Sequence, residues 1–149
     1  MSAESAIKAV LEADATLLAT ATGGVWSFDE TGHKGLSRTL TPAAFDSNGI
    51  LKPCIMVSQR NANPGYNLQD DNGQMVDVRQ VVELYMFQDD AYSAIETMKS
   101  RCYALLHAQR LTGYHRVEWA GDVRLGRDLD LDAYTERVDY LTIYVRSGS

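Results

Sequence analysis

The sequence has 149 residues, of which 45% are hydrophobic and 23% are charged, and its net charge at pH 7 is −6. This length fits one domain with a core large enough to fold without disulfides or metals, and no apolar run approaches the roughly 20 residues of a membrane span. The acidic balance disfavours tight binding to nucleic acid, which depends on clustered Lys and Arg side chains.

Apolar residues recur at helical spacing from Ala3 to about Thr20, which predicts one amphipathic helix that ends at Gly23-Gly24. The segment has no basic region followed by an apolar core, so we expect no signal peptide. Val25 to Phe28 has the pattern of a short strand. Residues 29–52 are polar and contain several turn-forming residues, which predicts a long loop.

A second strand is predicted at Pro53–Ser58, because proline is permitted at the first position of a strand. The residues that follow, about 59–75, contain many Asn, Asp and Gly residues and predict a second long loop. Long loops inside a compact domain often carry function, so we expect this loop to reach a partner.

The segment from Val76 to Gly113 has the clearest periodicity in the chain. Val76–Gln88 carries apolar residues at most of its even positions, which predicts a long strand with one buried face. Helical spacing follows from about Asp90 to Leu111. Asp89 or Asp90 is the predicted N-cap, and Gly113 is predicted to follow the end of the helix.

Two further strands complete the predicted fold. Apolar and charged residues alternate over Val117–Leu125, with a bulge expected at Gly121, and a turn at Asp128–Ala133 leads to a last strand at Arg137–Arg146. We therefore expect a single domain over residues 1–149 of the α+β class. In it, two helices pack on one face of a mostly antiparallel sheet, as a two-layer sandwich with the order α-β-β-β-α-β-β.

Helices on one side leave the other face of the sheet without a helical cover. There we expect apolar and tyrosine side chains among charged neighbours, a composition typical of protein interfaces. The candidate subunit interface consists of Val81, Tyr85, Phe87, Tyr140 and Tyr144. The alternative is that the loops at 29–52 and 59–75 fold over this face.

The acidic segment Asp128–Asp132 has the alternating carboxylates that begin an EF-hand loop. The match fails further on, because Ala133 stands where the sharp turn needs Gly and Asp139 stands where a bidentate Glu belongs. A solvated acidic turn is the better interpretation, and we expect no metal site.

No other pattern in the chain indicates chemistry. His33, His107 and His115 lack the spacing of metal ligands or of a nucleophile and its base. Cys54 and Cys102 lie on a predicted strand and on the apolar face of a predicted helix, so we expect small buried side chains. We therefore expect no catalytic, cofactor-binding or metal-binding residues.

The order of elements resembles the tail terminator (tail completion) proteins of long-tailed bacteriophages, from about Ile7 to Arg146. The segments that carry the resemblance are the opening helix at 7–18, the Gly-Gly-Val-Trp turn at 23–26, the proline-led strand at 53–58, the strand–helix block at 76–112 and the tyrosine-rich strand at 140–145. The long segment at 29–52 departs from the family pattern. The family has no catalytic residues to carry over.

The resemblance implies a structural virion protein without a cofactor. Such proteins form a ring, commonly a hexamer, that caps the head-proximal end of the tail tube, stops its polymerisation and joins the tail to the head connector. The implied partners are other copies of the chain, the tail tube protein and the head connector or a neck protein. The implied location is the tail–neck junction of the virion, and the host cytoplasm during assembly, with no membrane and no specific grip on DNA passing through the lumen.

Three other interpretations stay open from the residues alone. The chain could be another neck component, such as a head-completion or head–tail adaptor protein. It could be a cytosolic α+β binding domain for a small ligand or a peptide, or a small enzyme whose residues converge only in three dimensions.

Overall fold

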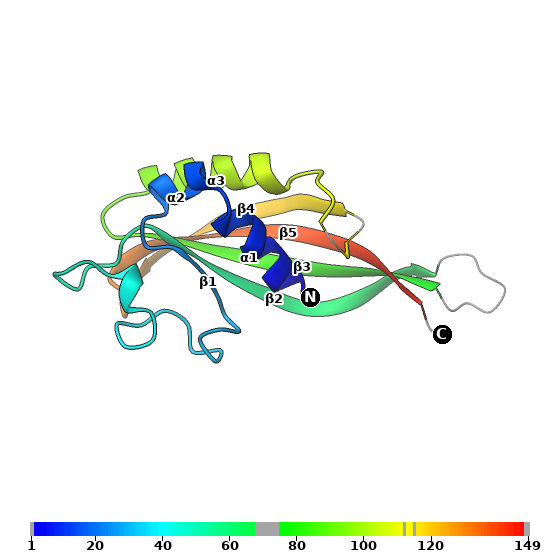
Figure 1. Ribbon diagram of the computed structural model, residues 1–149, viewed down its shortest axis with the longest axis horizontal. Coiled ribbons are helices and arrows are strands. Elements are labelled where there is room, and N and C mark those ends of the chain that lie inside the picture. Colours follow the sequence, from blue (N-terminus) through cyan, green and yellow to red (C-terminus); the bar gives the residue numbers. More distant parts are fainter. Residues whose placement is uncertain (1, 68–74, 112, 115, 148–149) are drawn as a thin grey trace.

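A five-stranded sheet and three helices form two layers, in a computed structural model that describes residues 2–67, 75–111, 113–114 and 116–147 (Figure 1). The helices are α1 (Ala3–Glu12), α2 (Ala15–Thr20) and α3 (Ser93–Leu106), with a short 3-10 turn η1 (Pro42–Ala44). The strands are β1 (Val25–Ser27), β2 (Cys54–Asn67), β3 (Met75–Gln88), β4 (Arg116–Asp128) and β5 (Ala133–Ser147). The predicted α+β class is confirmed.

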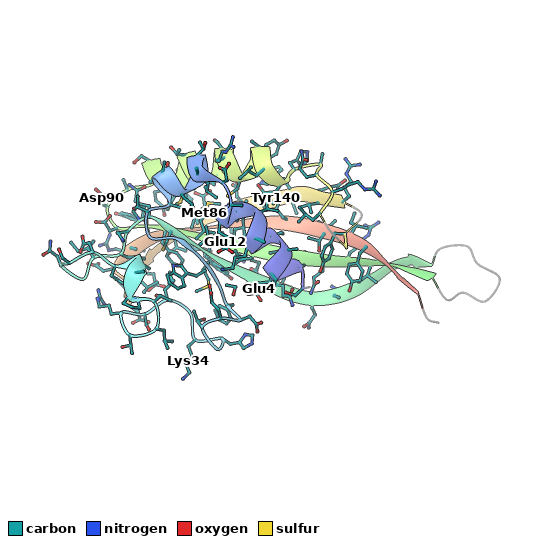
Figure 2. The ribbon with its side chains drawn as sticks, in the orientation of Figure 1. Glu4, Glu12, Lys34, Met86, Asp90 and Tyr140 are labelled. Atoms are coloured by element: carbon teal, nitrogen blue, oxygen red, sulfur yellow. The ribbon has the colours of Figure 1, made fainter. Side chains whose placement is uncertain are left out.

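The strands lie in the order β1-β2-β3-β5-β4, and every neighbouring pair is antiparallel except β1 with β2. All three helices lie on one face of this sheet (Figure 1). The main core fills the space between the two layers and includes Ile7, Ile55, Leu84, Met86 and Met98, each at most 3% exposed. Figure 2 shows Met86 in this layer below the helices.

The first predicted helix is two helices, so the expectation of one continuous helix from Ala3 to Thr20 is wrong. The break is at Asp14, whose carboxylate accepts a hydrogen bond from the backbone N–H of Leu17 at 2.8 Å and so caps α2. The same carboxylate makes two hydrogen bonds with the Arg101 guanidinium, both at 2.8 Å. This pair joins α2 to α3 and holds the pKa of Asp14 at about 2.

We expect the Asp14→Asn variant to lose stability in a pH-dependent way. Asn retains the cap but not the charge, so the variant isolates the ion pair with Arg101. Because the pKa of Asp14 falls from 3.8 to about 2 on folding, the pair stabilises the protein above pH 3.8 and loses this effect as the pH falls through 2.

Thermal melting at several pH values measures this effect. The difference in Tm between wild type and Asp14→Asn should be largest near neutral pH and become much smaller toward pH 2. Asp130→Asn, in the exposed turn after β4, is the matched control and should show no such dependence. A difference for Asp14→Asn that persists unchanged at pH 2 would contradict the assignment.

The second predicted loop is largely strand. β2 continues through residues 59–67, where it pairs with β3 as far as Asn67 opposite Val76, with register shifts at Gln59/Ala62 and at Pro64/Asn67. The bulges accommodate the turn-forming residues that suggested a loop. Of the predicted loop at 59–75, residues 68–74 lie outside the described residues. β2, β3 and β5 extend beyond the helices (Figure 1).

The predicted strand at Val76–Gln88 is confirmed by β3, but α3 is shorter than the predicted helix. Its N-cap position is Tyr92, not Asp89 or Asp90, and the Gln88 side chain instead accepts hydrogen bonds from the N–H groups of Ala94 and Ile95, at 2.7 and 3.4 Å. The helix ends at Leu106 because the chain turns there to pair with β4 through the bridge between residues 109 and 117. Gly113 therefore does not follow the helix directly.

The last two strands match their predictions in type, and both are longer than predicted. The bulge at Gly121 is confirmed by the register shift between Trp119 and Gly121, where the glycine has a φ of 125°. A second shift lies between Arg124 and Gly126. Residues 129–132 make the turn, in which the Asp128 carboxylate accepts the N–H groups of residues 130 and 131 at 2.9 and 3.0 Å.

The segment between β1 and β2 folds over one end of the other sheet face (Figure 1). Phe45 and Leu51 of this segment are buried there against Met56 and Phe87. The alternative cover by the loop at 29–52 is therefore confirmed for this end of the face. Lys34 projects from the segment away from the sheet (Figure 2).

Candidate assembly interface

The five residues of the predicted interface do not share one surface. Val81 and Tyr85 lie on the face opposite the helices and are half-buried. Phe87 shares that face but is only 6% exposed, because the segment between β1 and β2 covers it. Tyr140 is fully buried in the main core, so its assignment to an exposed face is wrong. Figure 2 shows Tyr140 below α3.

Tyr144 also lies on the helix side of the sheet. The register pairs Tyr140 with Val82 and Tyr144 with Val78, and directly opposite residues in an antiparallel pair point to the same face. The ring of Tyr144 contacts that of Tyr114 edge to face at 5.4 Å. The residues of β5 that share the face of Val81 are instead Leu141 and Ile143. Both faces of β5 carry apolar or aromatic residues, so its periodicity separates the two faces, but only the register with β3 says which of them faces the helices.

The open part of the sheet face carries a network of opposite charges. Arg60 contacts Glu83 at 3.1 Å, and Arg137 contacts Glu83 at 3.4 Å and Asp139 at 3.1 Å. These residues come from three adjacent strands, and the Glu83 and Asp139 side chains are only 11% and 17% exposed. Tyr85 donates a hydrogen bond to Glu83 at 3.1 Å.

This network orients its own members and carries no net charge. Burial, followed by the nearby Glu83 carboxylate, raises the pKa of Tyr85, so its phenol remains a neutral donor at physiological pH. Val81, Leu141 and Ile143 border the network on the same face and are partly exposed. A surface of arginine, tyrosine and aliphatic groups with paired charges suits contact between proteins.

Tyr85 and Phe87 also line a recess of ≈ 280 Å³ between the segment that follows β1 and the β4–β5 turn. Its other large apolar lining residues are Phe28, Leu36, Met56 and Leu131. The recess is open to solvent and lies next to the charged network, so it extends the same surface.

The edge strand β4 is a surface that sequence reasoning missed. Seven large apolar side chains are exposed among the described residues, and five of them lie on β4, on the turn after it or on the adjacent α3. They are Tyr103, Trp119, Val123, Leu125 and Leu129, with exposures from 42% to 86%. The alternation of β4 predicted a half-buried strand, but the bulge at Gly121 breaks the alternation, and of the apolar side chains of β4 only Val117 is buried.

Between α3 and β4 lies a second recess, of ≈ 360 Å³, whose lining includes Tyr103, Trp119 and Tyr140. Lys99 also lines it and forms ion pairs with Glu136, which is 1% exposed, and with Asp122 at 3.5 Å. Burial alone would lower the pKa of Lys99, but hydrogen bonds to Glu136 and Glu96 outweigh this and raise it. The ammonium group therefore stays charged and holds α3 to β4 and β5.

The cysteine and histidine side chains that the structure describes are buried or contact neighbouring residues. Cys54 and Cys102 are free and fully buried, and burial raises the pKa of both thiols to about 12. His107 accepts a hydrogen bond from the N–H of Trp119 at 3.1 Å. His33 lies 3.5 Å from Asp29 on an exposed segment. His115 lies outside the described residues.

Other kinds of site would need a metal-binding cluster or a membrane-spanning helix within residues 2–67, 75–111, 113–114 and 116–147. Nowhere in these ranges do three or more His, Cys, Asp or Glu side chains gather in a way that could hold a metal ion. Among the same residues, no helix is long and apolar enough to cross a membrane.

Comparison with known proteins adds one finding. No protein-family model matches the sequence, and no curated protein matches it. Among solved structures, a chain of the virion of a native gene transfer agent (GTA) particle has a similar fold, with a TM-score of 0.64 and 12% sequence identity. The match covers 97% of this chain and 95% of that one, so the two chains share a fold along nearly their whole lengths.

Proposed function

We propose that this chain is a structural protein of a phage-like virion. The observation that carries the proposal is the fold shared with a chain of a gene transfer agent virion, over 97% of one chain and 95% of the other. A match over 97% of the chain extends well beyond a single pair of helices or strands. A structural role also agrees with the pairing of the charged groups on the open sheet face.

Within such a particle, we assign the chain the role of tail terminator. In this role, copies form a ring, a hexamer in the simplest case, on the head-proximal end of the tail tube and join it to the head connector. A ring needs a heterologous contact that closes on itself, so each copy offers two different surfaces. The net charge of −6 favours a lumen that does not hold passing DNA.

The open sheet face is the surface we propose for the contact between ring neighbours. Val81 and Tyr85 remain in this interface, joined by Leu141 and Ile143. Phe87 and Tyr140 are excluded because they are buried, and Tyr144 is excluded because it lies on the helix side of the sheet. The paired charges of the network around Glu83 can exchange partners with a neighbouring copy and so select a single orientation.

Tube growth in solution tests the terminator role. Purified tube protein would be polymerised with and without this chain, and lengths and ends examined by electron microscopy. We expect tubes of defined length with a ring at one end. Unchanged lengths with this chain bound to the head connector would instead indicate an adaptor in the neck. Unchanged lengths with no binding to either partner would contradict the proposal.

The Val81→Asp variant tests the proposed ring surface. Val81 is half-buried beside Leu141, and a carboxylate there would lose its hydration when a neighbour covers it. We expect folded protein that no longer forms terminal rings, whereas Thr97→Asp, on the exposed side of α3, should behave as wild type. Circular dichroism checks the fold and electron microscopy counts the rings. Normal rings from Val81→Asp would place the contact elsewhere.

A further inference from the structure

The β4 edge of the sheet is both open and apolar, which is unusual for a strand at the end of a sheet. The other edge strand, β1, has only three residues and packs against α1. β4 has 13 residues, and all positions from Trp119 to Leu125 are exposed except the half-buried Gly121. A long exposed edge with apolar side chains is a template for another strand, so proteins usually cover it.

The directions of the β4 backbone groups follow from its hydrogen bonds. Val117 and Trp119 bond away from β5, to Gln109 and to His107, so the alternate residues bond toward β5. The bulge at Gly121 shifts this alternation by one residue, so Gly121 and Val123, which pair with Asp139 and Arg137 of β5, bond toward β5. The N–H and C=O groups of Asp122 and Arg124 therefore point outward, and among the described residues β4 pairs with no strand other than β5.

We propose that two free copies of this chain pair through β4, antiparallel, around a two-fold axis at Val123. The pairing goes beyond the proposed function, because it concerns the protein before it joins a particle. In this register Asp122 of each copy lies opposite Arg124 of the other. Both residues direct their backbone groups outward, so the two strands exchange four hydrogen bonds around the axis.

The charges select this register over its neighbours. An axis at Asp122 would place two Asp122 carboxylates opposite each other, and an axis at Arg124 would place two guanidinium groups together, and both arrangements are unfavourable. If one β4 strand were shifted by one residue against the other, backbone groups that point toward the second copy would lie opposite groups that point toward β5. The axis at Val123 instead brings Asp122 of each copy opposite Arg124 of the other. In the single copy these side chains contact Lys99 at 3.5 Å and Glu96 at 3.3 Å, and they remain 34% and 57% exposed toward a second partner.

The apolar groups of the edge are covered in the same arrangement. The two Val123 side chains meet on the face opposite the helices. Leu125 lies opposite Gly121 of the other copy, where an added Cβ would have no neighbour within 4 Å. Two-fold pairing is the commonest way in which identical chains associate.

The pairing has a consequence for assembly. A two-fold pair has no distinct tube and head sides, whereas a terminator ring requires them. The pair therefore covers the apolar edge of the free protein and has to separate before its copies enter a ring.

Disulfide cross-linking of the full chain tests the register. Opposite residues at a site without hydrogen bonds have Cα atoms about 4.5 Å apart, within the range of a disulfide. We expect Val123→Cys to form a covalent dimer on mild oxidation that reduction reverses. The native Cys54 and Cys102 are fully buried, so background should be low. Thr97→Cys, exposed on α3, is the control and should stay monomeric on the gel.

Two results would overturn the proposal. One is a dimer yield from Val123→Cys no higher than that from Thr97→Cys. The other is a higher yield from Asp122→Cys than from Val123→Cys, which would move the axis.

Charge reversal provides a second measurement that needs no cross-link. In the Asp122→Arg variant, the new arginine of each copy lies opposite Arg124 of the other, and the like charges repel. We therefore expect the dimer dissociation constant, measured by sedimentation equilibrium, to rise about tenfold. Asp130→Arg makes the same change of charge on the exposed turn and should leave the constant nearly unchanged. Equal effects of the two variants, or a wild type that stays monomeric at every concentration, would refute the pairing.

Discussion

Replacing Tyr140 by alanine will lower the free energy of unfolding by about 4 kcal/mol. Tyr140 is fully buried between α3 and the sheet, so its removal leaves a cavity lined by core side chains. Urea denaturation followed by circular dichroism measures the change. If Tyr140 instead lay on an exposed interface, the variant would keep its stability and lose only assembly.

The Tyr140→Phe variant separates packing from polarity at the same position. The Tyr140 hydroxyl is buried, and among the described residues it has no hydrogen-bond partner. Removing a buried polar group that has no partner breaks no hydrogen bond. It also removes the free-energy cost of taking that group out of water on folding. We therefore expect Tyr140→Phe to be as stable as wild type or more stable. A loss approaching that of Tyr140→Ala would show that the hydroxyl contributes a bond.

The second large effect is expected from Lys99→Met, at about 3 kcal/mol of destabilisation. The variant leaves the Glu136 carboxylate, which is 1% exposed, with Arg124 at 3.2 Å as its remaining cation. A buried charge that loses its partner destabilises a fold far more than the intact pair stabilises it. Urea denaturation at neutral pH measures the loss.

Two controls make the Lys99 result specific. The double variant Lys99→Met/Glu136→Leu removes both charges and should recover most of the lost stability, because an apolar pair replaces the buried ion pair. Lys8→Met breaks a more exposed pair with Glu12, at 2.8 Å, and should cost about 0.5 kcal/mol or less. A double variant no more stable than Lys99→Met would indicate that the site cannot accommodate apolar side chains.

The elements with strong local periodicity could be predicted from the sequence. The even positions of β3 face the helices because alternation is a property of a single strand, and Val82, Leu84 and Met86 are fully buried as expected. The positions of Cys54 and Cys102 followed from the same kind of pattern. In each case the information lies within a few residues of the position concerned.

The features that could not be predicted depend on contacts between distant residues. The break between α1 and α2 involves Asp14 and Arg101, which are 87 positions apart. The extension of β2 past Ser58 depends on pairing with β3, which outweighs a run of turn-forming residues. The placement of Tyr140 depends on the register between β3 and β5, and no local pattern contains that register.

The candidate interface was predicted only in part for the same reason. Val81 and Tyr85 could be assigned to the face opposite the helices from the alternation of one strand. The charged network around Glu83 brings together β2, β3 and β5, so its members become neighbours only in the folded sheet. The open edge at β4 follows from the strand order, which places β4 last although β5 follows it in sequence.

The location of this chain in purified particles tests most directly whether it belongs to a phage-like virion, as we propose. Particles from cells that carry the gene would be purified, analysed by mass spectrometry and labelled with gold-coupled antibody against the chain. We expect its peptides in the particles and the label at the junction of tail and head. Particles that assemble fully without the chain, with all of it left in the soluble fraction, would contradict the claim.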